Sequence, residues 1–404
     1  MYCVKKIRSY FPIFKKKNRL YLDNAASTYK PISVINKEYN FYKYEYLSYN
    51  KSLYSNSLNN KVEYTRKIIS KFINSNYNEI IFTKGATESI NLVSNSLLYN
   101  NEFLKKGDNI IISNIEHHSN FVTWKFLLKK KNIEIKILPI NKKNGYFKKN
   151  FLKKIINNKT KFISITHVSN VLGVLNDIEE IICIIKNINK NILVLVDGSQ
   201  AISHIKVDVK KINCDFYVFS GHKMYGPLGI GILYGKKKIL DKMKPWQLGG
   251  SIIKNIYNNK IIFVDSPWKF ETGTMNSASV IGINESIKFI NKIGINNIYN
   301  WENKILEYSI NKLKKIKDII IYCDNIYNKL SIISFNIKNI NCNDIGFLLK
   351  NSNIYIRTGH QCSIPIMNLY KISGVCRISY AMYTNFDDID FFIENLKFIK
   401  KKFF

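Results

Sequence analysis

Short apolar runs alternate with helix-length segments through the middle of this 404-residue chain, and that alternation limits the possible folds more than any other feature. Helix-length segments such as Ala86–Leu98 and Ile178–Asn187 separate runs rich in Ile and Val. The pattern predicts an α/β domain with a mostly parallel sheet, in which ligands bind beyond the carboxyl ends of the strands. The predicted strands are Glu79–Thr83, Asn109–Ser113, Lys161–Thr166, Ile192–Asp197, Phe216–Ser220 and Gly229–Tyr234.

The last third of the chain has a different pattern, which begins near Ser279. Long helices and a few strands predict a smaller α+β domain there. We therefore expect an N-terminal arm over residues 1–20 that packs with the small domain, a large domain over 21–278, and a small domain over 279–404. The predicted small-domain elements are helices Ile281–Ile293, Ile298–Lys315 and Asp387–Lys401, and strands Ile319–Tyr322 and Ser331–Ile337.

The N-terminal segment Met1–Arg19 is basic and lacks acidic residues, as targeting peptides do. It has no apolar region and no small-residue cleavage site, and strand-like sequence follows at once in Leu20-Tyr21-Leu22. We interpret it as an uncleaved arm rather than a transit segment.

The formal net charge is +33, from 62 Lys and Arg against 29 Asp and Glu. Such a charge often marks a protein that binds nucleic acid or membranes. Here the lysines run from end to end together with abundant Ile and Asn, and all three residues have A/T-rich codons. Genome composition therefore accounts for the charge, and we predict no nucleic-acid partner. No stretch approaches 18 uncharged apolar residues, so we also predict no membrane span.

The seven cysteines are scattered, odd in number and contain no C-x-x-C pair. This spacing argues against a disulfide framework and against a zinc site, so we predict no metal. It favours a reducing compartment, and we expect the protein to be cytoplasmic.

A lysine that could form a Schiff base follows the strand Phe216–Ser220, in the segment Ser220-Gly221-His222-Lys223. Ser220 and His222 could hold a phosphate, and partial burial would lower the pKa of Lys223. Asp197 ends another apolar strand, where it either caps the next helix or meets a cation such as the pyridine nitrogen of pyridoxal 5'-phosphate (PLP). Gln200 could then reach the hydroxyl of that ring.

Other strand ends carry residues of the same kind. Lys84-Gly85-Ala86-Thr87 joins a strand to a helix, and its free N–H groups with the Thr87 hydroxyl make either a phosphate cradle or an ordinary glycine turn. His117 could stack on a flat cofactor and move protons, although a single histidine is more often structural. Asn170 holds the equivalent place after the next strand.

A reactive cysteine is predicted in Arg357-Thr358-Gly359-His360-Gln361-Cys362, where Gly, His and Arg favour an accessible thiolate. We interpret the other six cysteines as packing residues. Arg377 could bind a carboxylate through two parallel hydrogen bonds.

Taken together, these segments resemble the class V aminotransferase group of fold-type I PLP-dependent transferases. The resemblance covers essentially the whole chain and includes Tyr21-Leu22-Asp23-Asn24-Ala25-Ala26, Glu116-His117-His118 and Thr166-His167-Val168-Ser169-Asn170. It implies a large PLP-binding domain with a mostly parallel seven-stranded sheet, and a smaller α+β C-terminal domain that carries the catalytic cysteine. The segment that ends in Cys362 resembles the SufS-type (group II) cysteine desulfurases.

The resemblance assigns a role to each candidate residue. It implies that Lys223 is the Schiff-base lysine, His117 the ring-stacking acid and base, and Asp197 the partner of the pyridine nitrogen. Arg377 would clamp the substrate carboxylate with Arg357 nearby, and Cys362 would carry the persulfide. Thr274 would reach the phosphate of the neighbouring subunit. The remaining residues that the resemblance places on the cofactor are Ala86, Thr87, Asn170, Gln200, Ser220 and His222.

The implied activity is the conversion of L-cysteine to L-alanine, with a persulfide on Cys362 that supplies sulfur for iron-sulfur cluster assembly. The implied partners are a second copy of the chain, in a homodimer, and a sulfur-acceptor protein of the SufE or SufU type. A selenocysteine lyase or another class V PLP enzyme is the alternative. A non-enzymatic basic binding protein is the alternative from another class, and a colourless protein after PLP addition would favour it.

Three departures from the family pattern stand out. The family's Asn-x-His-Arg-Gly-x-His stretch is replaced by Leu47-Ser48-Tyr49-Asn50-Lys51-Ser52. Gln361 stands where many relatives have a second histidine, and Met275 where proline is usual. None of the three removes a core catalytic group.

Overall fold

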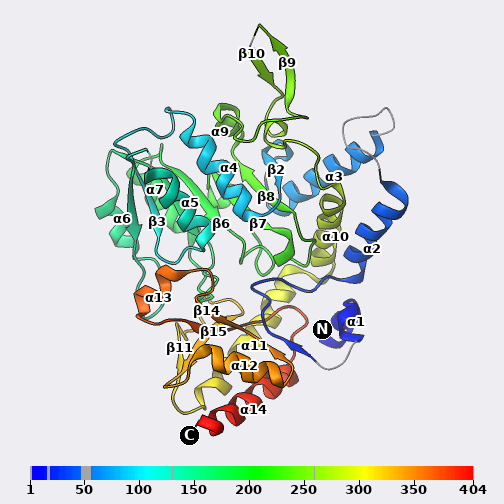
Figure 1. The fold of residues 1–404 in the computed structure, drawn as a ribbon, viewed down its shortest axis with the longest axis vertical. Helices are drawn as coiled ribbons and strands as arrows, with labels where there is room; N and C mark the ends of the chain where they lie inside the picture. The colour runs from blue at the N-terminus through cyan, green and yellow to red at the C-terminus, as the bar shows by residue number, and fades with distance from the viewer. Residues whose placement is uncertain (1, 16–18, 47–55, 130, 259, 404) are drawn as a thin grey trace.

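A seven-stranded sheet forms the centre of the larger part of the protein (Figure 1). The computed structural model describes residues 2–15, 19–46, 56–129, 131–258 and 260–403. In the sheet only β8 runs antiparallel to its neighbours, so the predicted α/β fold with a mostly parallel sheet is confirmed. In spatial order the strands are β2 (Ile80–Thr83), β8 (Gly231–Gly235), β7 (Phe216–Ser220), β6 (Leu193–Asp197), β5 (Thr160–Thr166), β3 (Asn109–Ser113) and β4 (Glu134–Leu138).

Helices cover both faces of this sheet, because successive side chains of a strand point to opposite faces. In β3, Ile110 and Ile112 pack with α4 and α5, whereas Ile111 belongs to the core on the other face. The helices of the first face are α4 (Ala86–Leu98), α5 (His118–Lys129) and α9 (Lys237–Lys242). Those that pack into the other core are α3 (Asn56–Phe72), α6 (Lys149–Ile155), α7 (Ile178–Ile188), α8 (Val209–Ile212) and α10 (Ser277–Ile293).

Polar residues end several strands at one edge of the sheet. Asp197 ends β6 and Ser220 ends β7, and Ser220 pairs with Gly231 at the start of the returning strand β8. A Cβ atom on Gly231 would lie 2.4 Å from the Cα atom of Gly85, so β8 touches the turn that leads into α4. This close approach brings the Gly85 turn beside the segment that follows β7.

A second, antiparallel sheet lies at the other end of the molecule (Figure 1). Its order is β11 (Ile319–Ile321), β12 (Ile332–Ile337), β15 (Val375–Ser379) and β14 (Arg357–Gly359). It shares a core with α11 (Ile295–Lys314), α12 (Cys342–Asn351) and α14 (Phe386–Phe403). The helices and strands predicted after Ser279 are therefore present, within a few residues of the predicted limits. Beside this sheet lie α13 (Ile364–Tyr370) and the pair β1 (Leu20–Tyr21) and β13 (Ile354–Tyr355).

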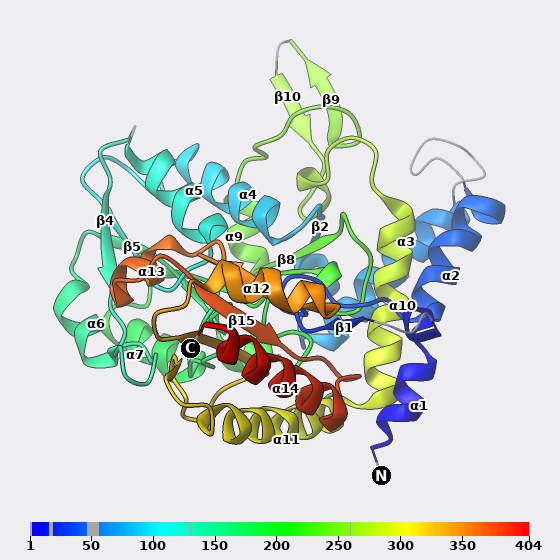
Figure 2. The same cartoon turned by 60° about the horizontal axis from the view of Figure 1, so that its bottom comes forward.

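The N-terminal segment packs against residues near the C-terminus (Figure 2). In it, α1 (Val4–Ser9) is followed by a 3-10 turn, Pro12–Lys15. The Tyr2 hydroxyl donates to the Met382 carbonyl at 2.6 Å, and Arg8 forms an ion pair with Asp388. The proposed boundary at residue 279 falls in the first turn of α10, which packs with α2 (Ile32–Asn40) and α3. The division into domains therefore stays a prediction.

Two features were not foreseen from the sequence. The hairpin of β9 (Ile253–Tyr257) and β10 (Lys260–Phe263) projects from the body of the protein (Figures 1 and 2). In addition, Cys3 and Cys183 are exposed, so the prediction that all six other cysteines are packing residues is wrong. Cys183 lies on α7 between residues that do reach the core, Ile182 and Ile185, which shows that it faces outward.

The remaining short elements are a π-helical turn, Phe41–Glu45, and 3-10 turns at Tyr77–Glu79, Gly221–Lys223 and Trp268–Phe270. Within the described ranges no helix is both long and apolar enough to cross a bilayer.

Asparagine occupies many left-handed backbone positions in this fold. Of the 14 non-glycine residues with positive φ in the described part of the chain, seven are Asn. Asn213, for example, ends α8 with a φ of 57°. Asparagine tolerates this conformation better than most residues, because its short amide can bond to the local backbone.

Candidate active site

A cavity of about 190 Å³ lies where the polar strand ends meet the loop after β14. All the predicted catalytic, cofactor and substrate residues line it except Thr274, although they come from widely separated segments. They are Ala86, Thr87, His117, Asn170, Asp197, Gln200, Ser220, His222, Lys223, Arg357, Cys362 and Arg377.

One end of the cavity is an anion cradle at the start of α4. The Ala86 N–H donates to the Ser220 hydroxyl at 2.8 Å, and the side chains of Thr87 and His222 line the same cavity. Burial lowers the pKa of His222 to about 4, with Lys223 and Lys30 adding to the effect. His222 is therefore a neutral hydrogen-bonding group at neutral pH, and the cradle can hold a phosphate through dipoles and N–H groups.

Lys223 and Asp197 form the electrostatic centre of the site. Burial lowers the pKa of Lys223, and the negative charge of Asp197 opposes that shift. Asp197 is 5% exposed, and one of its carboxylate oxygens accepts from the Ser199 N–H at 2.9 Å. A lysine with a lowered pKa supplies the neutral amine that attacks a carbonyl, and a buried carboxylate can bind a protonated ring nitrogen.

His117 is held in one orientation by Ser119. The Ser119 N–H donates to Nδ1 of His117 at 3.2 Å, and the Ser119 hydroxyl lies 2.9 Å from the same atom. In the neutral ring the proton is then on Nε2. Burial lowers the pKa of His117 to about 4, and the charge of Lys223 adds to this shift. His117 is therefore neutral at neutral pH and available as a base.

Arg377 is almost fully buried, with 3% of its surface exposed. Its Nη2 lies 2.6 Å from Asp23 Oδ1, and its Nη1 donates to the Asn170 carbonyl at 3.0 Å. Its Nε atom is buried and has no hydrogen-bond partner among the described residues. An arginine that lines a cavity with a donor unsatisfied can bind a carboxylate there.

The loop after β14 brings a thiol into the cavity. Cys362 is partly buried, and its Sγ atom lies 3.9 Å from Nη2 of Arg357. The Asn170 side chain donates to the Gln361 carbonyl at 2.8 Å. Gln361 is 3% exposed, and its amide donates to the Val375 carbonyl at 3.2 Å. Gln361, the glutamine that departs from the family pattern, therefore ties this loop to strand β15 through a buried hydrogen bond.

The cavity fits a flat cofactor with a phosphate. It combines an anion cradle, a buried carboxylate, an amine of lowered pKa and an imidazole, and the guanidinium of Arg377 lines it as a group that can bind a substrate carboxylate. When bound, PLP supplies an electron sink for carbanion chemistry. The cradle, Asp197 and Lys223 would hold it.

Three supporting residues were missed by the sequence analysis. Asp23 pairs with Arg377, Ser119 orients His117, and Glu116 lies buried beneath the site. Burial raises the pKa of Glu116 to about 8, although hydrogen bonds from Ser113 and Asn120 oppose the shift. Asp23 and Glu116 belong to segments that the resemblance had identified, but no local pattern indicates what a carboxylate contacts across the fold.

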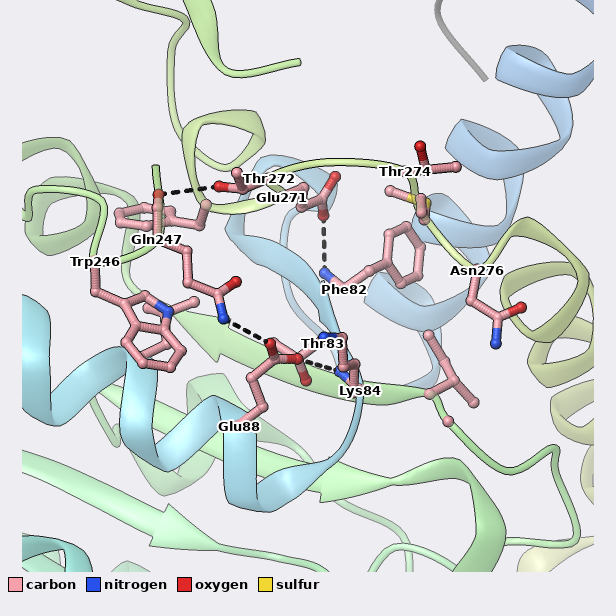
Figure 3. Close-up of a pocket in the computed structure, with 15 residues that line it drawn as sticks. Phe82, Thr83, Lys84, Glu88, Trp246, Gln247, Glu271, Thr272, Thr274 and Asn276 are labelled. Carbon is pink, nitrogen blue, oxygen red and sulfur yellow. Dashed lines mark hydrogen bonds between the residues drawn. The ribbon is translucent and has the colours of Figure 1, made fainter. Parts of the chain in front are cut away.

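Thr274 lies outside the cavity and is exposed. It lines a separate hollow of about 300 Å³ together with Lys84, Glu88 and Gln247 (Figure 3). There the Gln247 amide approaches one oxygen of Glu88 at 3.4 Å, and the Lys84 N–H donates to the other. The structure therefore does not bring Thr274 to the cradle of its own chain. The stretch 47–52, where the family's histidines are absent, lies outside the described residues.

Comparison with known proteins places this arrangement in a family. Residues 20–392 match the family model for aminotransferase class-V. A cysteine desulfurase of Wigglesworthia glossinidia brevipalpis is 47% identical over 99% of this chain and 98% of its own. A cysteine desulfurase of Escherichia coli (strain K12) is 39% identical over 99% of both chains.

Solved structures agree with this match. The apo cysteine desulfurase of Thermococcus onnurineus NA1 superimposes with a TM-score of 0.93 at 29% identity, over 98% of both chains. The cysteine desulfurase CsdA of Escherichia coli gives 0.90 at 28% identity, over 100% of this chain and 99% of that one.

The chain therefore belongs to the class-V aminotransferase family of fold-type I PLP enzymes. Within that family it is a PLP-dependent cysteine desulfurase, as its full-length relatives are. The predicted family, fold, enzyme class and cofactor are confirmed.

Proposed function

We propose that this enzyme converts L-cysteine to L-alanine and holds the released sulfur as a persulfide on Cys362. The observation that carries the proposal is the position of Cys362, whose thiol lines the same cavity as Lys223 and lies 3.9 Å from the Arg357 guanidinium. The thiolate is the nucleophilic form of cysteine.

In the proposed reaction each residue performs one task. The guanidinium of Arg377 binds the substrate carboxylate, and the Lys223 amine removes and returns the proton on Cα. The Cys362 thiolate attacks the substrate sulfur, so that an S–S bond forms as the C–S bond breaks. The electron pair of that C–S bond stays on Cβ of the substrate. Cβ then takes up a proton and becomes the methyl group of alanine. The carbon is reduced and the transferred sulfur is oxidised, so no other oxidant is needed.

We further propose that the enzyme works as a homodimer in the cytoplasm. Thr274 supports the dimer, because it is exposed beside the Lys84 turn but does not reach the cradle of its own chain. In a dimer, Thr274 would meet the phosphate held by the partner subunit.

The proposed partner is an acceptor protein of the SufE or SufU type, as part of a SUF system for iron-sulfur cluster assembly. A hollow of about 670 Å³ supports this partner, because it lies beside the Cys362 loop between α5 and α13. Its lining is mainly apolar and includes Val122, Ile364 and Pro365, with Lys125 and Lys129 among them. An acceptor with an apolar centre and acidic rim would fit it, and its effect on turnover should weaken as salt is raised.

Replacement of Cys362 tests the proposal most directly. We expect Cys362→Ser to retain bound cofactor and its visible absorbance, because the cradle, Lys223 and Asp197 are unchanged. Alanine formation should fall by roughly a hundred-fold or more, because a serine hydroxyl is protonated near neutral pH and is a poor nucleophile towards sulfur. Mass spectrometry of the parent enzyme after cysteine addition should locate one extra sulfur on Cys362.

The matched control is Cys183→Ser, which removes an exposed thiol outside the cavity. It should make alanine at the parental rate. Near-parental alanine formation by Cys362→Ser, or extra sulfur on Cys3 or Cys183 instead, would contradict the proposal.

A further inference from the structure

The loop that carries the reactive thiol has two successive left-handed residues. Gln361 has a φ of 54° and Cys362 a φ of 55°, and neither is glycine. Such a backbone is unfavourable for residues with a Cβ atom and persists only where surrounding contacts impose it. The contacts on this loop therefore determine where the thiol lies.

Besides the bonds of Asn170 and Gln361 described above, two histidine rings contact the loop on either side of Cys362. The Cys362 N–H donates to Nδ1 of His360 at 3.1 Å, and the Ile364 N–H donates to Nε2 of His118 at 3.1 Å. The rings are neighbours, with centroids 5.5 Å apart. The backbone of His118 adds a third bond, because its N–H donates to the Cys362 carbonyl at 2.7 Å.

We propose that His118 and His360 are positioning residues that, as neutral rings, clamp the Cys362 loop in the conformation that presents the thiol to the substrate sulfur. Protonation of a ring removes its bond and loosens the loop, so sulfur transfer slows at acid pH while the cofactor stays bound. This inference rests on the proposed function of Cys362 and extends it to the residues that place the thiol.

The chemistry of imidazole explains the dependence on protonation. A neutral ring has one acceptor nitrogen, whereas a protonated ring has two donors and no acceptor. A protonated His360 would therefore face the Cys362 N–H donor to donor, and a protonated His118 would do the same with Ile364. Each bond therefore exists only while its ring is neutral, and it is lost when that ring is protonated.

The surroundings of His118 favour its neutral ring. Burial lowers the pKa of His118, and the neighbouring His360 adds to that shift. Most facing groups are basic, and the buried Glu116, whose pKa burial raises to about 8, is uncharged in the acid range. The facing groups are Lys125 and Lys129 from α5, Arg357 from β14, Cys362 from the loop, and Glu116 and His117 from the turn before α5.

Two double variants test whether His118 and His360 position the Cys362 loop or have only a structural role. His118→Gln with His360→Asn keeps an acceptor near each bond but cannot be protonated. His118→Ala with His360→Ala removes both acceptors. Lys131→Gln is the control, because it removes a positive charge from an exposed residue that lines neither the cavity nor the hollow beside it.

The holoenzyme of each variant is mixed with cysteine from about pH 5.5 to about pH 8, the range in which histidine titrates. Alanine formation in a single turnover and cofactor absorbance are measured. Hydrogen exchange of peptides that cover residues 357–366 reports the loop itself. The Lys131→Gln control should match the parent in all three.

The alanine pair should lose roughly 4- to 100-fold in alanine formation at neutral pH, because it removes two hydrogen bonds and each contributes roughly 2- to 10-fold. Its loop should exchange faster, with cofactor absorbance unchanged. The amide pair should stay within about three-fold of the parent at neutral pH and lack the parent's loss of rate at acid pH.

Two results would contradict the proposal that His118 and His360 hold the Cys362 loop. One is parental turnover and loop exchange in the alanine pair. The other is an amide pair with the same acid loss as the parent, which would assign that loss to the thiol or to His117. Loop exchange does not depend on where sulfur goes, so a failure of the Cys362 assignment would be seen separately, in the Cys362→Ser variant.

Discussion

The buried ion pair between Arg66 and Glu271 offers a sharp test of how the site is supported. Arg66 is fully buried on α3; its Nη1 lies 2.7 Å from Glu271, and its Nη1 also donates to the Ile80 carbonyl at 2.6 Å. Glu271 in turn accepts from the Phe82 N–H at 2.8 Å. The pair therefore ties the segment that leads to Thr274 to strand β2. We expect Arg66→Met to destabilise the protein strongly.

The magnitude follows from what the substitution leaves behind. Removing one partner of a buried ion pair costs about 3–5 kcal/mol, because the remaining charge is buried without compensation. The guanidinium also lies 4.5 Å from the centre of the Phe82 ring, and losing that contact adds about 1 kcal/mol. Burial already raises the pKa of Glu271 against the opposing charge of Arg66. In the variant the carboxyl is protonated more easily, so the defect should shrink as the pH falls towards the unfolded value of about 4.3.

Urea unfolding of the holoenzyme, at fixed protein and cofactor concentrations, measures the change in the free energy of unfolding. Lys314→Met is the control, because Lys314 pairs with Asp324 at 2.7 Å with both side chains about half exposed, and it should cost about 0–1 kcal/mol. Glu271→Gln should recover part of the loss in the Arg66→Met background. A cost equal to that of the control, or no recovery in the double variant, would refute the reasoning.

Three further substitutions test other parts of the structure. In Lys223→Ala, borohydride treatment should leave no cofactor mass attached to the protein, whereas the parent should carry it on the Lys223 peptide; attachment elsewhere would refute the assignment. Arg377→Ala should raise the KM for cysteine by roughly ten-fold or more, and an unchanged KM would mean that Arg377 is structural. Gly198→Ala should lower the free energy of unfolding by about 1–3 kcal/mol or more, because its Cβ atom would lie 2.1 Å from the Tyr217 ring. Gly250→Ala, with nothing within 4 Å, is its control and should change the urea midpoint little.

The sequence was sufficient for features that depend on local pattern. Strand β3 and helix α4 begin and end at the predicted residues, because alternation and polar boundaries are encoded locally. Asp197, Ser220 and Lys223 were found because they follow apolar strands, and parallel strands bring their carboxyl ends together. The whole set, however, was recognised through resemblance to a family as well as through pattern.

Contacts between distant segments could not be predicted in the same way. Asp23 and Arg377 are 354 positions apart and meet only because β15 and the segment after β1 lie together. Cys183 was misassigned because its sequence neighbours, such as Ile182 and Ile185, are apolar, whereas the side of a helix that one residue faces depends on what packs against it. The histidine bonds to the Cys362 loop depend on backbone dihedrals that no residue type specifies.

The asparagines with positive φ suggest how the amino-acid composition of this protein changed while its fold was kept. Glycine codons are rich in G, whereas asparagine codons begin with two A, so mutation towards A/T depletes glycine. At a position such as Asn213 the replacement costs little, because asparagine tolerates a positive φ and restricts the unfolded backbone more than glycine does. A lineage could therefore accumulate lysine on the surface and asparagine at helix ends while its catalytic cavity stayed unchanged. On this view the charge of +33 records the history of a genome, and the catalytic chemistry evolved independently of it.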